Sequence, residues 1–159
     1  MLVRMICVLV VGCLSFLLPR CAAAQAGTNP APATCGVDID GEKADAVEAA
    51  CLRELGKRAS RKGDLLTLQL ENGGSKTYRD DNAKACEADD TLKCTYYRLA
   101  AYHPQAKVYS IWIQYYEGSG VELLSARTGK VLLVSGTPYF SPDGSRFVVI
   151  DNDLSLIHI

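Results

Sequence analysis

The antiparallel β fold of this chain is indicated by one stretch of sequence: Gly136-Thr137-Pro138-Tyr139-Phe140-Ser141-Pro142-Asp143-Gly144-Ser145-Arg146-Phe147-Val148-Val149-Ile150. It predicts a strand, a tight turn and a second strand. Pro142 presets φ at about −65° at the second turn position, and Gly144 tolerates conformations that other residues avoid. The predicted turn motif is therefore Ser141, Pro142, Asp143 and Gly144.

A related corner lies 38 residues earlier, where His103 and Pro104 occupy the positions of Ser141 and Pro142. In both places an aromatic residue, a polar residue, Pro and two turn residues precede an apolar run that contains an aromatic residue. Propeller blades recur at about 40–50 residues, so the offset is compatible with a blade repeat. The alternative is an antiparallel meander whose turns simply use common turn residues.

The Phe-Ser-Pro-Asp-Gly corner followed by an apolar run resembles the turn that opens each blade in TolB-like and WD-repeat-like bacterial β-propellers. Ser125 to Lys130 resembles the Thr-Gly turn between the outer strands of such blades. The resemblance covers about residues 95–153 and implies partial propeller-like blades. It departs from the pattern at Gln105-Ala106, where Asp-Gly is expected, and no third unit is visible. It implies an architecture and no activity.

Period-two patterns predict further strands over 95–102, 107–116, 121–126, 130–134 and 145–150. A hairpin is predicted over Asp64–Arg79, because Leu66, Leu68 and Leu70 alternate with polar residues before Asn72-Gly73. Both turn positions of that hairpin are expected to take positive φ. The predicted class is mainly β, an antiparallel meander with one N-terminal amphipathic helix.

That helix is predicted over Glu42–Lys62, with Asp40 as its N-cap and Gly63 as its stop. Apolar residues recur at helical spacing, and Glu48 is assigned to the polar side. The helix is expected to cover a sheet edge or end, with a partner-binding helix as the alternative. Its apolar stripe comprises Ala44, Val47, Ala50, Cys51 and Leu55.

Residues 1–26 predict a secretory signal peptide. Arg4 precedes the apolar run Ile6–Leu18, and small residues lead up to Ala26. The run is shorter than a membrane span, which needs about 20 residues. No membrane span is expected after cleavage. A lipobox-like Cys13 leaves a lipoprotein as the alternative. The predicted localisation is periplasmic or secreted.

Four cysteines remain after cleavage: Cys35, Cys51, Cys86 and Cys94. In an oxidising compartment they predict two disulfides with three pairings. Loop-closure entropy favours Cys35–Cys51 and Cys86–Cys94. Zinc is disfavoured, because there is no Cys-x-x-Cys pair and His103 is the only histidine before residue 154.

No catalytic, cofactor or metal residue is predicted. His103 is expected to be structural or surface-exposed, since no carboxylate partner is evident in the sequence. The Asp38–Glu42 segment predicts a turn rather than a calcium loop, and its spacing does not fit an EF-hand. The polar, acidic segment Asp80–Lys93 is expected to be a solvated loop rather than a metal site. Its acidic residues are Asp80, Asp81, Glu87, Asp89 and Asp90.

The formal net charge is −1. Removing Arg4 and Arg20 from 17 basic residues leaves 15 against 18 acidic ones, a net charge of −3 without a basic patch. Nucleic acid is therefore not an expected partner. The expected function is a non-catalytic binding or scaffold module whose partner is an envelope protein or an extracellular ligand. The alternatives are a small disulfide-stabilised secreted inhibitor, or part of a propeller enzyme whose site lies further along the chain.

Leu154–Ile159 resembles the translation of a transposase-adapter sequence used in preparing DNA libraries, so the natural protein is expected to continue beyond Asp153. A partial propeller would expose strand edges and favour a partner or further chain. The predicted organisation is a signal peptide over 1–26, a lead-in over 27–41, a helix, hairpin and disulfide-tied loop over 42–94, a propeller-like sheet over 95–153, and adapter sequence over 154–159.

Overall fold

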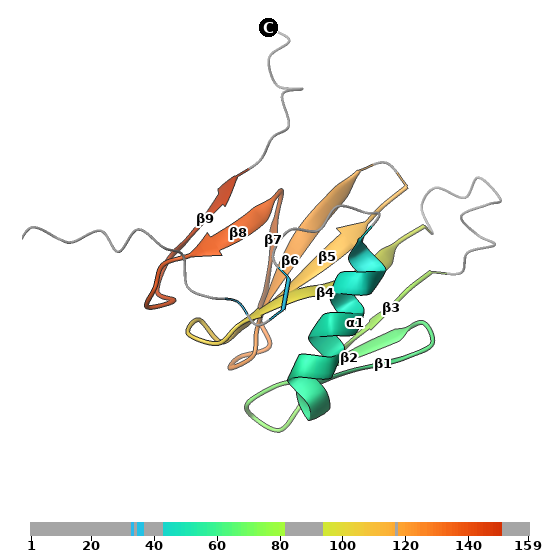
Figure 1. The fold of residues 1–159 in the computed structure, drawn as a ribbon, viewed down its shortest axis with the longest axis horizontal. Helices are drawn as coiled ribbons and strands as arrows, with labels where there is room; N and C mark the ends of the chain where they lie inside the picture. The colour runs from blue at the N-terminus through green and yellow to red at the C-terminus, as the bar shows by residue number, and fades with distance from the viewer. Residues whose placement is uncertain (1–32, 34, 37–42, 82–93, 117, 151–159) are drawn as a thin grey trace, which may run out of the picture.

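The computed structural model describes residues 33, 35–36, 43–81, 94–116 and 118–150. Within them the chain is mainly β, with three antiparallel sheets and helix α1 (Ala44–Leu55), which confirms the predicted class. Figure 1 shows α1 lying across β4, with β1–β3 to one side of it and β8–β9 to the other. The strands are β1 (Ala59–Lys62), β2 (Leu65–Gln69), β3 (Ser75–Arg79), β4 (Tyr96–His103), β5 (Val108–Gln114), β6 (Ser119–Ser125), β7 (Val131–Val134), β8 (Thr137–Phe140) and β9 (Phe147–Ile150).

The predicted helix ends early, and residues 56–62 form a 3-10 turn and a strand instead. Helix α1 ends at Gly56, which takes a φ of +52°, a conformation that stops helices and suits glycine. A 3-10 turn over Gly56–Arg58 follows, and β1 then pairs antiparallel with β2. Gly63, the predicted helix stop, lies instead in the β1–β2 turn with a φ of +60°. Asp40, the predicted N-cap, lies outside the described residues.

The hairpin predicted around Asn72-Gly73 is present as β2–β3. Its turn chemistry differs from the prediction, because only Gly73 takes a positive φ, of +84°. The Asn72 side-chain oxygen instead accepts a hydrogen bond from the Gly74 backbone N–H at 2.9 Å. Asn72 therefore fixes the turn through its side chain, as Asx-turns do.

The four-stranded sheet is a meander in which β4, β5, β6 and β7 pair in sequence order. Its predicted strands are confirmed to within a few residues. Tyr109 on β5 donates a hydrogen bond to the Gln69 carbonyl at 2.8 Å, and Tyr78 on β3 donates one to the Glu122 carboxylate on β6, so the two larger sheets are joined. One buried cluster contains residues from both sides of the predicted boundary at 94/95: Cys51, Leu55, Ala59, Leu66, Leu68, Tyr78, Leu99, Tyr102, Tyr109, Ile111, Leu124 and Ala126.

The predicted Cys35–Cys51 disulfide is confirmed, with the two Cα atoms 4.9 Å apart. Cys51 is fully buried on α1, so the bridge ties residue 35 to the core side of the helix. Cys94 is also disulfide-bonded. Cys86 lies outside the described residues, and the Cys86–Cys94 pairing stays a prediction.

Replacing both Cys35 and Cys51 with Ala is expected to lower the free energy of unfolding by about 3 kcal/mol. The disulfide restricts the unfolded chain, and without it the chain loses more conformational entropy on folding. Urea unfolding followed by tyrosine and tryptophan fluorescence measures the change. The variant Lys57→Ala in the 3-10 turn is the control, since Lys57 is exposed. An unchanged urea midpoint in the double variant would contradict the expectation.

The two proline corners lie against each other. A Cβ atom added to Gly144 would come within 2.5 Å of the Ala106 backbone nitrogen and 2.6 Å of the Gln105 carbonyl carbon. Beside this contact, the rings of His103 on β4 and Phe140 on β8 are 4.3 Å apart. The hairpin β8–β9 is thus held against the β4–β5 corner by one aromatic contact and one close backbone approach.

Gly144→Ala is therefore expected to destabilise the protein more than Gly73→Ala does. Both glycines take a positive φ, but a Cβ on Gly73 meets nothing within 4 Å. Gly73→Ala should cost about 1–2 kcal/mol in backbone strain alone. Gly144→Ala should cost about 1–3 kcal/mol more, because the corner backbones must separate. Thermal unfolding of both variants compares the two, and equal losses would argue against the close approach.

Candidate functional site

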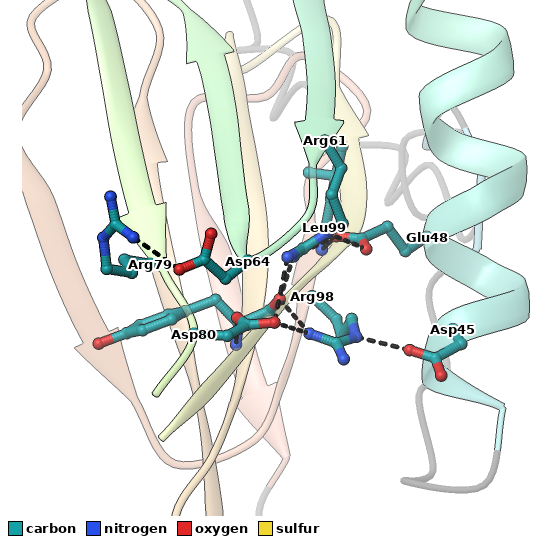
Figure 2. A network of polar contacts seen from close by, with 9 residues as sticks. Asp45, Glu48, Arg61, Asp64, Arg79, Asp80, Arg98 and Leu99 are labelled. Carbon is teal, nitrogen blue, oxygen red and sulfur yellow. Dashed lines mark hydrogen bonds and ion pairs between the residues drawn. The ribbon is translucent and has the colours of Figure 1, made fainter. Parts of the chain in front are cut away.

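Arg61 on β1 is the centre of a polar network that fastens α1 to the sheets (Figure 2). Its Nε lies 2.6 Å from Glu48 Oε2 and its Nη2 lies 3.0 Å from Glu48 Oε1, a two-pronged ion pair. Glu48 Oε1 also accepts a hydrogen bond from the Leu99 backbone N–H at 2.9 Å. Arg61 Nη1 reaches Asp80 Oδ2 at 3.1 Å, just beyond the end of β3.

Asp80 extends the network to a second arginine. Arg98 Nη1 lies 2.6 Å from Asp80 Oδ2, and Arg98 Nε lies 2.6 Å from Asp45 Oδ1 on α1. The other oxygen of Asp80 accepts the Tyr97 backbone N–H at 2.8 Å. Burial disfavours the charged guanidinium, but the hydrogen bonds to Asp45 and Asp80 outweigh it and raise the pKa of Arg98.

The carboxylates of this network are buried and already paired within the protein. The Glu48 side chain is 5% exposed and the Asp80 side chain 10%, and both carboxylates are occupied by arginine and backbone N–H groups. Neither carboxylate is left open to act on a substrate. Joining a helix, the end of a hairpin and β4 is what such an arrangement can do.

Two sequence predictions are corrected here. Glu48 is not on the polar side of α1, because it is buried among Ala44, Cys51 and Leu55. These positions share one helix face at spacings of four, three and four residues, a signal that the apolar count overlooked. Asp80 is not part of a solvated loop, since it is paired with two arginines. Glu87, Asp89 and Asp90 lie outside the described residues.

His103 is buried at the end of β4, not exposed in a turn. Its Nε2 lies 2.9 Å from the hydroxyl oxygen of Ser110 on β5, and within the described residues its Nδ1 has no hydrogen-bond partner. Burial lowers the pKa of His103 to about 4, so the ring is neutral at pH 7. Of the two roles expected for His103, structural or surface-exposed, the structure gives the structural one, because the ring packs between β4 and β8.

The pair of Ser110 and His103 has the spacing of a nucleophile and its base, but no access for a substrate. Both residues are 2% exposed, and the cavity beside them has a volume of about 20 Å³, enough for about one water molecule. In the described part of the chain, no carboxylate lines this cavity. The other lining residues are Ala100, Ala101, Trp112, Val121, Thr137 and Pro138.

The side chains of the turn motif form hydrogen bonds within the turn itself. Asp143 accepts hydrogen bonds from the Ser141 hydroxyl at 2.6 Å and from the Ser145 hydroxyl at 2.8 Å. These bonds lower the pKa of Asp143 to about 2. Gly144 takes a φ of +69°, and Pro142 and Asp143 are exposed on the outside of the corner. Pro104 is half-buried in the opposing corner.

An exposed apolar surface lies on the two strands β7 and β9. Six large apolar side chains there are between 40% and 59% exposed. Among the described residues, β7 pairs only with β6, so it is the free edge of the four-stranded sheet. We call these residues the apolar edge: Val131, Leu132, Leu133, Phe147, Val148 and Ile150.

A cleft of about 310 Å³ opens between β7 and the β8–β9 hairpin. Its walls are mainly apolar, and among the described residues Lys130 is the only charged residue that lines it. The sequence predicted β7 and β9 but not that their side chains would stay exposed, since an uninterrupted apolar run looks the same in a buried strand and in an edge strand. The cleft is lined by Val108, Leu123, Ser125, Thr128, Lys130, Val131, Leu132, Phe140 and Phe147.

Across the part of the chain that the structure describes, no helix is long and apolar enough to cross a bilayer. Within the same residues, no three His, Cys, Asp or Glu side chains gather as metal ligands would. Comparisons with protein-family models, with curated proteins and with solved structures find no match to this chain.

Proposed function

We propose that this protein is a non-catalytic, exported binding or scaffold module of the cell envelope, and that it binds through the apolar edge. The observation that carries the proposal is the exposure of Val131, Leu132 and Leu133 side by side on a free edge strand. Contiguous exposed apolar surface on a monomer marks an interaction site, and an unpaired edge offers backbone donors and acceptors.

The placement of the reactive side chains supports a binding role. The carboxylates of Glu48 and Asp80 are occupied by arginines, and the Ser110–His103 pair borders a cavity that holds no more than a water molecule. Export is supported by the signal-like residues 1–26 and by the Cys35–Cys51 disulfide, because disulfides persist in oxidising compartments.

A propeller-like arrangement is part of the proposal. The meander β4–β7 has the four strands of one blade, and β8–β9 would begin the next. Contact between the two corners at Ala106 and Gly144 is what neighbouring repeats of one unit would make. A module of this kind presents β7 at the edge of a paired sheet, which suits it to hold a partner.

Site-specific photo-crosslinking tests the binding role. A photoreactive residue at Leu132 is expected to give an adduct of one defined mass with an envelope component when the protein is exported by its host. The same residue at Glu54, exposed on α1, is the control and should give none. Adding Val148→Lys to the Leu132 probe should abolish the adduct. Equal adducts from both positions, or none from Leu132, would contradict the proposed function.

A further inference from the structure

We propose that β7 takes an extended apolar segment of a partner protein as an added strand, and that a carboxylate of this segment pairs with Lys130. This inference rests on the proposed function and names the kind of partner. The occupant is a peptide segment in strand conformation, whose backbone pairs with β7 and whose apolar side chain enters the cleft.

The backbone of β7 is oriented to accept such a strand. Ser125 N–H donates to the Lys130 carbonyl at 2.9 Å, and the register pairs Leu123 with Leu132. Because antiparallel ladders alternate between bonded and non-bonded pairs, the N–H and C=O groups of Val131 and Leu133 point away from β6. Each of these two residues therefore offers a donor and an acceptor on the free side.

The side chains around β7 favour an apolar occupant. Val131, Leu132 and Leu133 are 47%, 52% and 59% exposed, so both faces of the edge strand carry apolar surface. The cleft beside the strand is walled by Phe140 and Phe147, with a volume of about 310 Å³. Strand addition uses this combination, in which main-chain bonds give affinity and a pocket for alternate side chains gives specificity.

Charge specifies one end of the segment. Lys130 is exposed at the start of β7, and within the described residues it forms no ion pair. Of the residues that the structure describes, no carboxylate lines the cleft, so an acidic residue on the partner would pair with the lysine without competition from them. A second copy of this chain would bring the same lysine and no carboxylate from its own cleft, which favours a different protein as the occupant.

A phage-displayed library of random ten-residue peptides, selected on the disulfide-intact protein, provides the test. Enriched peptides are expected to alternate apolar residues and to carry Asp or Glu near one end. Lys130→Glu should lower the affinity of these peptides by about tenfold, the effect of losing one charge-assisted hydrogen bond. Leu133→Pro removes an outward N–H without removing a bond to β6, and should weaken them by at least about tenfold.

The peptides themselves supply a second measurement, in case Leu133→Pro disturbs the fold. Methylating backbone nitrogens at alternate residues should abolish binding in one register and spare it in the other. Leu133→Ala keeps the N–H and is the matched control, expected to weaken binding less than Leu133→Pro does. Binding that tolerates methylation in both registers would overturn strand addition.

Three further outcomes are decisive. A library that yields no peptide dependent on Leu133 overturns the proposal. A concentration-dependent dimer in sedimentation that Leu133→Pro dissociates also overturns it, because the occupant is then a second copy. A crosslink from Leu132 that survives both Leu133→Pro and Lys130→Glu leaves the proposed binding function standing and overturns only strand addition, so the two failures are distinguishable.

Discussion

Glu48→Ala is expected to lower the free energy of unfolding by about 3–5 kcal/mol, because it leaves the buried Arg61 guanidinium without its main counter-charge. The Leu99 backbone N–H loses its acceptor in the same change. Arg61 keeps two contacts, to Asp80 at 3.1 Å and to the Tyr97 carbonyl at 2.5 Å, which places the loss nearer the lower end of that range. Urea or thermal unfolding monitored by circular dichroism measures it.

Glu54→Ala is the matched control, since Glu54 lies on the same helix but is exposed; it should change stability by less than about 0.5 kcal/mol. The double variant Glu48→Leu with Arg61→Leu should recover much of the loss, because it removes both charges together. A double-mutant cycle then gives the coupling energy between the two residues. Equal effects of Glu48→Ala and Glu54→Ala would show that the network contributes little.

Acid is expected to destabilise the protein through His103. Its pKa is 6.5 when exposed and about 4 in the folded protein, so the unfolded chain binds the extra proton first. Stability from this group is fully present above pH 6.5 and falls as the pH is lowered through 6.5 to about 4. At 1.36 kcal/mol for each pKa unit, the loss amounts to about 3 kcal/mol.

Among the described residues, no charged group lies beside His103 to offset the positive charge. The residues that face it, Ser110 from β5, Phe140 from β8 and the lining of the small cavity, carry no titratable group. The loss of stability between pH 7 and pH 4.5 should therefore be about 2–3 kcal/mol smaller in His103→Gln than in the wild type. Carboxylates elsewhere titrate alike in the two proteins and cancel in this comparison. Parallel pH dependences for the two proteins would contradict burial as the cause.

Local sequence patterns predicted the strands and the first disulfide well. Alternation in Leu66–Leu70 and the punctuation at Asn72-Gly73 act over a few residues, so the hairpin followed from local rules. The Cys35–Cys51 bridge followed from short loop closure next to the apolar stripe of α1. These features depend little on what the rest of the chain does.

The features that sequence reasoning missed depend on tertiary contacts. The chain after Gly56 forms β1 because Ala59 is buried and pairs with Leu68 across the sheet, which overrides the helical spacing. Glu48 is buried because Arg61 and Leu99 come from other elements to meet its carboxylate. The exposure of Leu132 and Leu133 depends on which strand ends the sheet, and the uninterrupted apolar run over 131–134 gives no indication of that.

The packing of Phe140 has a consequence for how the molecule opens. Phe140 belongs to a small cluster with Val121 and Leu123, separate from the main core around Leu66 and Ile111. We therefore expect the β8–β9 ribbon to open as a unit of low local stability while the remainder stays folded. In native-state hydrogen exchange, the amides of β9 should exchange through local opening, whereas those of β5 should exchange only through global unfolding.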